Sequence, residues 1–279
     1  MANDKSEPLK DVEDWWSTSI INMSPGVIEF RGYPIQDLIG NVSFAQMIWL
    51  MLRGEPPAPG QAKLLEAALV ASVDHGPHAP SIAIARMAAT CGVGLNNAMA
   101  SAANVLGDSH GGAGEQCMEL FESVRAAMAN APLEAAAAQA LDAHRATYGK
   151  IIAGYGHRFH PIDPRVAPLL ELIEQAAVRG VVSGAYAPIA REVEAALERQ
   201  TGKRIPMNID GVTAAIFCEL GFAPPLGRGL FVLSRSVGIL AHAWEQQQQG
   251  ARNKGPAPKR VQFTYTGPAR RKLKEEDTP

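Results

Sequence analysis

Apolar residues recur at helical spacing along most of the 279-residue chain. In the segment 43–54, the apolar side chains at positions 44, 47, 48, 51 and 52 fall on one face of a helix. Ser43 is suited to cap the start of this helix, and Gly54 is suited to end it. Alanine, a strong helix former, supplies much of the hydrophobic 47% of the residues. The pattern therefore predicts a chain that is nearly all helix.

The same spacing predicts further helices over residues 60–73, 81–91, 96–106, 114–128, 132–148, 164–178, 188–200, 212–220 and 230–248. Strand-like pattern is confined to residues 26–31 and 260–265. Because strands and helices do not alternate, a parallel sheet is not expected, and the lack of a fixed period argues against a solenoid. The predicted fold class is all-α.

The charges nearly balance, with 26 Lys plus Arg against 28 Asp plus Glu, a formal net charge of -2. No overall basic field recruits nucleic acid, so an anionic ligand must be captured by locally placed cations. Cys91, Cys117 and Cys218 are odd in number and far apart, which fits a reducing compartment and small buried side chains.

The N-terminal residues 1–7 are polar and do not resemble a signal peptide. Charges such as Glu171 and Arg235 interrupt the later apolar runs, so no membrane span is expected. These features predict a cytoplasmic protein, with residues 268–279 as a solvated tail.

The segment 154–165 holds the most informative chemistry. It combines His157, which can carry a proton near neutral pH, with Arg165, which can grip a carboxylate. Gly154 and Gly156 let the backbone approach a ligand closely. The loop is predicted to hold a small anion.

Three histidines, His75, His110 and His157, lie in predicted loops beside glycine or proline, where functional residues are common. His144 and His242 fall within helices and are predicted to be packed or surface residues.

His110 precedes two glycines and a helix start, so it is suited to donate to a developing oxyanion, although an ordinary glycine-rich turn gives the same pattern. Asp210 stands at a helix entrance, either as an N-cap or as a desolvated base with a raised pKa.

Two further arginines are candidates for anion binding. Arg235 lies in an apolar helix and needs an anionic partner, which is either an internal carboxylate or a substrate. Arg260 lies near the end of the chain, where a solvated surface position is the simplest interpretation.

Taken in order, these segments resemble the citrate synthase superfamily, most closely its short citryl-CoA lyase branch. The resemblance covers nearly the whole chain and rests on residues 31–38, 43–44, 74–77, 110–112, 154–165, 208–210, 235 and 260–268.

The resemblance implies a two-domain helical fold and a homodimer or higher homo-oligomer. The large domain comprises residues 1–111 and 222–279, and the small domain residues 112–221. The implied catalytic residues are His110, His157 and Asp210; the implied substrate-binding residues are His75, Arg165, Arg235 and Arg260, with Arg260 supplied across the dimer interface; and Gly154, Tyr155 and Gly156 lie against coenzyme A.

The implied substrates are citryl-CoA, or an acyl-CoA with a 2-oxo acid, with no permanently bound cofactor and no metal. In condensation, Asp210 takes a proton from acetyl-CoA, His110 donates to the thioester oxygen and His157 protonates the oxaloacetate ketone. In cleavage of citryl-CoA the roles reverse, so that His157 removes the hydroxyl proton and Asp210 protonates the enol.

The chain departs from ordinary citrate synthases in ways that favour the lyase branch. It is short for the family, the interval from His157 to Arg165 is one residue tighter, and Gly211 replaces an expected aromatic residue. The segment 75–80 also lacks the usual asparagine and serine-rich continuation.

Three alternatives stay open. The first is a citrate synthase or 2-methylcitrate synthase, and the second is a non-catalytic helical protein that binds coenzyme A. The third is a metal enzyme that uses the His-x-x-His pairs at positions 75 and 78 or 157 and 160, although neither pair has the neighbouring acid of a familiar zinc motif.

Overall fold

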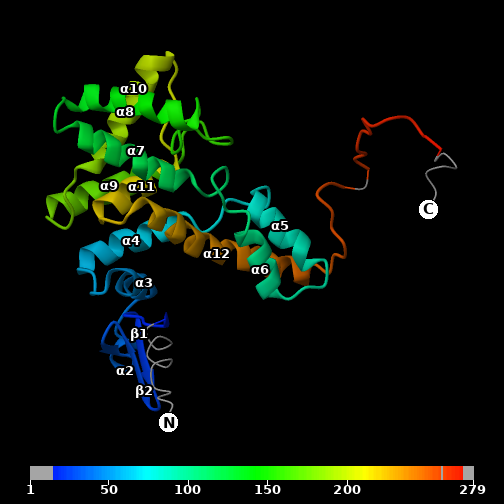
Figure 1. The fold of residues 1–279 in the computed structure, drawn as a ribbon, viewed down its shortest axis with the longest axis horizontal. Coiled ribbons are helices and arrows are strands. Elements are labelled where there is room, and N and C mark those ends of the chain that lie inside the picture. The colour runs from blue at the N-terminus through cyan, green and yellow to red at the C-terminus, as the bar shows by residue number, and fades with distance from the viewer. Residues whose placement is uncertain (1–14, 259, 273–279) are drawn as a thin grey trace, which may run out of the picture.

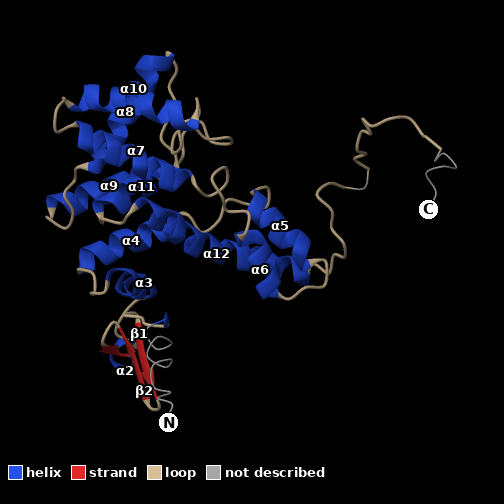
Figure 2. Cartoon of the chain, in the orientation of Figure 1, coloured by secondary structure: helices blue, strands red, loops and turns tan. Residues whose placement is uncertain are grey.

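The structure is a computed structural model that describes residues 15–258 and 260–272, and these residues are mainly helical (Figures 1 and 2). A small antiparallel sheet near the N-terminus comprises β1 (Ile21–Ser24), β2 (Val27–Phe30) and β3 (Tyr33–Pro34). The helices are α2 (Ile35–Leu38), α3 (Phe44–Arg53), α4 (Pro59–Ala71), α5 (Pro80–Ala89), α6 (Leu95–Ala103), α7 (Ala113–Ala127), α8 (Leu133–Tyr148), α9 (Val166–Val178), α10 (Tyr186–Thr201), α11 (Ile209–Glu219) and α12 (Pro224–Gln248). The predicted all-α class is confirmed. None of the described helices is long and apolar enough to cross a membrane.

The predicted helices are all present, and local signals explain most of their ends. Ser43 caps α3 as predicted: its side chain accepts from the Gln46 amide, while the Gln46 side chain accepts from the Ser43 amide. Helix α12 begins at Pro224 rather than at 230, with proline at its first helical position. Gly227 lets this first part of the helix approach α7 closely. A Cβ there would collide with the Met118 sulfur.

The predicted strand over 26–31 is confirmed as β2, which pairs with β1 and β3 on either side. The predicted strand over 260–265 is wrong, since these residues form no strand in the described structure. A strand needs a neighbouring strand for its hydrogen bonds, and the sheet formed by the described residues ends at β1 and β3. The predicted solvated tail is described only as far as residue 272, where it is exposed, and its remainder lies outside the described residues.

Two apolar clusters organise the helices. The larger one buries side chains of α3, α4 and α7 to α11, among them Phe121, Ile173 and Ile189. The smaller one joins α5, α6 and the second half of α12 through residues such as Ile82 and Ile239. Figure 1 shows these two groups side by side, with α12 running through both. The division into domains at residues 112 and 221 stays a prediction.

A backbone contact between two glycines fixes the loop 154–165 against the start of α11. A Cβ on Gly211 would lie 2.5 Å from the Gly154 carbonyl oxygen, and one on Gly154 would lie 2.5 Å from the Cys117 sulfur. The Asn208 amide donates to the Gly154 carbonyl (2.9 Å), and the Gly156 amide donates to the Pro206 carbonyl (2.7 Å). Gly211 is therefore required by packing, which accounts for the missing aromatic side chain at this position.

Asp163 ties the other end of the loop to the same helix. Its carboxylate accepts from Arg165 Nε (2.9 Å) and Nη2 (2.8 Å) and from the Ile209 amide (3.0 Å), while only 2% of the residue is exposed. Burial alone would raise the pKa of Asp163, but these hydrogen bonds and the Arg165 charge outweigh it and lower the pKa from 3.8 to about 2. Arg165 and the first turn of α11 are therefore held by one carboxylate.

Replacing Gly211 by alanine should cost about 1–3 kcal/mol of unfolding free energy, because the added methyl group has no space against the Gly154 carbonyl. Gly229→Ala is the matched control: a Cβ there meets nothing within 4 Å in helix α12, so the change should stabilise by about 0.5–1 kcal/mol. Urea unfolding of both variants checks this. Equal effects of the two substitutions would contradict the packing argument.

Asp163→Asn should lower the unfolding free energy at pH 7 by about 2–3 kcal/mol, since each unit of pKa depression is worth about 1.4 kcal/mol. Because the folded-state pKa lies below the unfolded one, the contribution is fully present above pH of about 4 and is lost as the pH falls through about 2. The difference between variant and wild type should therefore shrink in acid, measured by urea unfolding at several pH values. Asp142→Asn, which removes an exposed ion pair to Arg145, should change stability by less than about 0.5 kcal/mol. A difference that persists in acid would contradict the assignment.

Candidate active site

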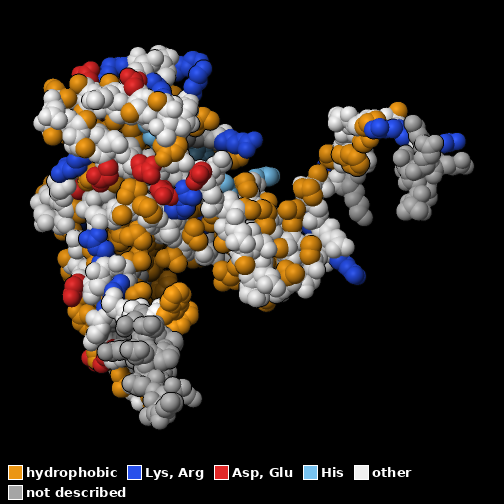
Figure 3. All heavy atoms as spheres, viewed as in Figure 1, with side chains coloured by type: hydrophobic (Ala, Val, Ile, Leu, Met, Phe, Trp, Pro, Cys, Tyr) orange, Lys and Arg blue, Asp and Glu red, His pale blue; other side chains and the backbone are white. Residues whose placement is uncertain are grey.

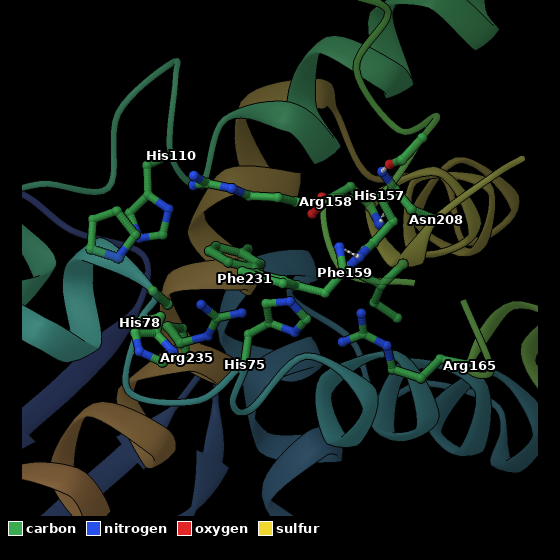
Figure 4. Close-up of a pocket in the computed structure, with 16 residues that line it drawn as sticks. His75, His78, His110, His157, Arg158, Phe159, Arg165, Asn208, Phe231 and Arg235 are labelled. Atoms are coloured by element: carbon green, nitrogen blue, oxygen red, sulfur yellow. Dashed lines mark hydrogen bonds between the residues drawn. The ribbon is translucent and has the colours of Figure 1, made fainter. Parts of the chain in front are cut away.

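Most of the site residues predicted from the sequence meet in a cleft of about 660 Å³ between the two groups of helices. Figure 3 shows histidine side chains at the surface where these groups meet, and Figure 4 shows the cleft itself. The predicted residues that line it are His75, His110, Gly156, His157, Arg165, Asp210 and Arg235. They come from the loops before α5, α7 and α9 and from helices α11 and α12, so sequence segments far apart form one site.

Three of the predicted residues lie elsewhere. Gly154 is packed against Cys117 and Gly211, and Tyr155 is buried with its hydroxyl donating to the Ala190 carbonyl (2.7 Å). Of Gly154, Tyr155 and Gly156, only Gly156 lines the cleft. Arg260 is exposed on the C-terminal segment and does not line the cleft of its own chain.

His110 is held with one ring nitrogen free. Its Nε2 accepts from the Ser81 amide (3.1 Å) and lies 2.9 Å from the Ser81 hydroxyl. Since Nε2 is an acceptor, the proton of the neutral ring is on Nδ1. Burial, and then the charge of Arg235, lowers the pKa of His110. His110 is therefore a neutral hydrogen-bond donor, set by a serine that the sequence analysis did not identify.

His157 is held through its Nδ1 atom, whereas His110 is held through its Nε2 atom. Its Nδ1 accepts from the backbone amides of Phe159 (3.0 Å) and His160 (3.0 Å), so the proton of the neutral ring is on Nε2. Burial, and then the neighbouring His160, lowers the pKa of His157. The short turn that follows His157 supplies both amides.

The Asp210 side chain does not cap helix α11, because Asn208 does so, and its carboxyl group can therefore face the cleft. The side chain of Asn208 accepts from the amides of Asp210 (2.9 Å) and Gly211 (3.3 Å), so Asn208 is the N-cap of α11, and the reading of Asp210 as the cap is wrong. Burial raises the pKa of Asp210, against the opposing charges of Arg235 and Arg165. A carboxyl group with a raised pKa in a cleft can both take and return a proton.

Arg158, Arg165 and Arg235 give the cleft its positive charge, and the last two were predicted from the sequence. Arg165 is paired with Asp163. Arg235 is 5% exposed, its Nε donates to the Ser72 carbonyl (3.2 Å), and its guanidinium lies 4.7 Å from the Phe231 ring centroid. Among the described residues, no carboxylate lies within salt-bridge distance of Arg235. A buried arginine without an ion-pair partner at a cleft is suited to bind an anion.

His75 stands on a loop that α5 and α12 hold in place. The Asp74 carboxylate accepts from the Gly76 amide (3.1 Å) and from His242 Nε2 (3.3 Å), and Arg86 donates to His242 Nδ1 (2.9 Å). The sequence predicts only a packed or surface position for His242 and gives no signal for Arg86, because only the tertiary structure brings them to this loop. His144 is buried as predicted.

Other residues also line the cleft, namely His78, Arg158, Phe159, Asn208 and Phe231. The sequence predicts a role for His78 only as part of a metal-binding pair and for Asn208 only as part of the segment 208–210, and it predicts no role for the other three. Arg158 follows His157 directly, and its exposed side chain extends across the cleft in Figure 4. Within residues 15–258 and 260–272, no group of three His, Cys, Asp or Glu side chains is arranged to hold a metal ion.

Comparison with known proteins identifies the family. The family model of the citrate synthase C-terminal domain matches residues 43–256. The citrate synthase of Acidithiobacillus ferridurans is 28% identical over 210 residues, which are 74% of this chain and 52% of that protein. The citrate synthase of Haloferax volcanii is 30% identical over 207 residues, which are 71% of this chain and 50% of that protein. The chain spans about half the length of these relatives.

Solved structures extend the match to almost the whole chain. The citryl-CoA lyase of Hydrogenobacter thermophilus is 34% identical, covers 94% of this chain and 98% of its own, and gives a TM-score of 0.81. The ATP citrate lyase of Methanothrix soehngenii, solved with citrate and coenzyme A, shares the fold at 19% identity, with 96% of this chain and 45% of that one covered and a TM-score of 0.73. Since the family model spans most of the residues and the full-length match has the same helical fold, the chain belongs to the citrate synthase family.

Proposed function

We propose that the protein cleaves citryl-CoA to acetyl-CoA and oxaloacetate. The observation that carries the proposal is Arg235, a buried cation open to a cleft that also holds two uncharged histidine donors and a carboxyl group of raised pKa. Such a site suits a substrate that is anionic at one end and exchanges a proton at the other.

The oxaloacetate half of the substrate carries two carboxylates, which Arg165 and Arg235 would bind. The planar guanidinium of each can form paired hydrogen bonds to a carboxylate. His157 would donate from Nε2 to the oxygen that is a hydroxyl in citryl-CoA and a ketone in oxaloacetate.

The acetyl half would lie between His110 and Asp210. His110 would donate from Nδ1 to the thioester oxygen as negative charge develops on it, an interaction worth about 100- to 1,000-fold in rate. Asp210, protonated at the start, would give its proton to the enol carbon, a transfer worth about 100- to 10,000-fold.

The lyase is preferred to a synthase because the similarity to a citryl-CoA lyase runs over nearly the full length of both chains. Citrate synthase, or 2-methylcitrate synthase, is the second candidate, since the curated relatives are citrate synthases. A non-catalytic coenzyme A binder would not need two histidines fixed as donors beside a carboxyl group of raised pKa.

We further propose that the protein acts as a homodimer in which Arg260 reaches the partner's cleft. Helix α12 exposes apolar side chains at one-turn intervals, at Leu233, Val237, Leu240 and Trp244, and Figure 3 shows apolar side chains over α5 and α6. An apolar surface of this kind is typical of a face that a second copy covers. In this arrangement the small domain, residues 112–221, would close over the substrate.

Incubation with synthetic citryl-CoA tests the reaction when oxaloacetate and free thiol are followed separately. We expect oxaloacetate without thiol, because the thioester survives carbon-carbon cleavage. Asp210→Asn should lower turnover by about 100- to 10,000-fold with the fold intact, since the amide group has no acidic proton to transfer to the enol carbon. Thiol without oxaloacetate would support the hydrolytic half of a synthase instead, and near-normal turnover in Asp210→Asn would contradict the proposed role.

Mixing two inactive variants tests the role of Arg260. If Arg260 serves the partner's cleft, a dimer of Arg235→Ala with Arg260→Ala has one site with both arginines intact. Random exchange of subunits should therefore restore about a quarter of the wild-type activity. If Arg260 serves its own cleft, neither site of the mixed dimer is intact, and activity would stay at the level of the separate variants.

A further inference from the structure

We infer that His242 is a positioning residue that keeps Asp74 from pairing with Arg235, so that Arg235 stays available for a substrate carboxylate. The inference rests on the proposed function, in which Arg235 binds the oxaloacetate half of the substrate. Three observations carry it: Asp74 packs beside Arg235, no ion pair joins the two in the described structure, and His242 holds Asp74 in place.

Asp74 packs against helix α12 one turn away from Arg235. A Cβ on Gly238 would lie 3.1 Å from the Asp74 Oδ1 atom and 2.2 Å from the Val73 carbonyl oxygen, so this segment is in direct contact with the helix backbone. Gly238 follows Arg235 by three residues and therefore lies on the same face of the helix. Arg235 itself donates from Nε to the Ser72 carbonyl (3.2 Å), two residues before Asp74. The packing therefore brings the Asp74 carboxylate and the Arg235 guanidinium near each other.

The two groups carry opposite charges that would favour an ion pair. Burial alone would raise the pKa of Asp74, but hydrogen bonds from the Gly76 amide and from His242 outweigh it and lower the pKa, so Asp74 is a carboxylate at neutral pH. Burial lowers the pKa of Arg235, and the negative charges of Asp210 and Asp74 oppose this effect. Of these two, Asp210 is protonated at the start of the proposed reaction, which leaves Asp74 as the charged carboxylate. A buried arginine gains stability from a carboxylate within reach, and the pair would occupy the outer nitrogens that the substrate needs.

His242 holds the carboxylate in a different position. Its Nε2 atom lies 3.3 Å from both carboxylate oxygens of Asp74, and its Nδ1 atom lies 2.9 Å from the Arg86 guanidinium. Because a guanidinium can only donate, Nδ1 accepts, and the ring proton on Nε2 is donated to Asp74. The Gly76 amide donates to the same carboxylate oxygen, Oδ2 (3.1 Å). Asp74 is therefore held through Oδ2 by one side chain and by the backbone of its own turn.

The other oxygen of Asp74 is left without a hydrogen bond. Oδ1 is buried, and no residue in the described part of the chain donates a hydrogen bond to it. The outer nitrogens of Arg235 likewise form no hydrogen bond to the described residues. Buried groups without partners gain from pairing, so the two would meet if the carboxylate could turn. His242 is the side chain that prevents this.

Arg86 is fixed in turn, so the support reaches from helix α5 to the end of α12. Its guanidinium binds the side chains of Glu245 and Gln249 (2.9 Å) besides that of His242. This arrangement leaves His242 with an acceptor towards Arg86 and a donor towards Asp74. A side-chain amide has the same two functions, which makes glutamine the conservative replacement for His242.

The test measures oxaloacetate binding by calorimetry and the kinetics of citryl-CoA cleavage in the full-length protein. His242→Leu keeps much of the volume but can neither accept from Arg86 nor donate to Asp74. We expect its Kd for oxaloacetate and its KM for citryl-CoA to rise about 10- to 100-fold, the size of a lost hydrogen bond to a charged group, with a smaller change in kcat. His242→Gln should bind nearly as the wild type does. Glu245→Gln, the matched control on the same helix, should do the same, since its amide oxygen can still accept from Arg86.

A second substitution separates this role from general support of the loop. Asp74→Asn removes the charge that would compete for Arg235, so adding it to His242→Leu should restore affinity to within about threefold of the wild type. General support predicts the opposite, because asparagine at position 74 cannot repair a loop that has lost its contact with His242. Affinity that stays low or falls further in the double variant would overturn the inference.

A crystal structure of His242→Leu tests the competing pair directly. We expect an Asp74 oxygen within hydrogen-bond distance of an outer nitrogen of Arg235, and His242→Ala takes the place of the leucine variant if that variant does not fold. An Asp74 carboxylate that keeps its wild-type position, with Arg235 unpaired and affinity reduced, would overturn the inference alone. A wild type that neither binds oxaloacetate nor cleaves citryl-CoA would instead overturn the proposed function, and the inference with it.

Discussion

The site depends on the close contact of two stretches of backbone, the loop that carries His157 and the first turn of the helix that carries Asp210. Gly154 and Gly211 meet with no space for a side chain on either, and hydrogen bonds from the backbone of Asn208 and Gly156 close the contact. The Asn208 side chain adds another bond by donating to the Gly156 carbonyl (2.6 Å). Because backbone atoms have little freedom to shift, the distance between the ketone end and the methyl end of the substrate is set before any ligand arrives. The contact between the loop and the helix leaves no space for a side chain at position 211, where the family resemblance leads us to expect an aromatic residue.

Charge in the cleft follows from the same arrangement. Asp163 neutralises Arg165 and holds it in place through paired hydrogen bonds, while Arg235 donates through its Nε to Ser72 and lies over the Phe231 ring, and within the described residues its outer nitrogens form no hydrogen bond. Burial, and then the charges of Arg165 and Arg235, lowers the pKa of His75, while burial and Arg235 lower the pKa of His110. The neutral form of both histidines is therefore favoured. Burial has the opposite effect on Asp210, whose protonated form is stabilised. The same cleft therefore favours neutral histidines and the protonated form of Asp210.

Local signals in the sequence predicted most of the fold and the main members of the site. The capping residues of α3, the alanine-rich helices and the glycines beside His110 and His157 act over a few residues, so they can be recognised without tertiary structure. Features that depend on distant contacts were missed. Among them are the close approach of Gly227 to Met118 and the anchoring of the His75 loop by Arg86 and His242. Two local signals were also missed, namely Pro224 at the start of α12 and Asn208 as the cap of α11. For residues 260–265 the local pattern predicted a strand that does not form, because no neighbouring strand is present in the described residues to pair with it.

The close backbone contact should join the two halves of the site rigidly before substrate binds. Hydrogen exchange of the backbone amides of Gly156, Asn208 and Ile209 in the ligand-free protein tests it most directly, since these three amides donate the bonds between loop and helix. We expect these amides to exchange only through global unfolding, with protection equal to that of the buried helices, and we expect oxaloacetate to add little protection. Fast exchange in the free protein, with protection gained only when ligand binds, would contradict it.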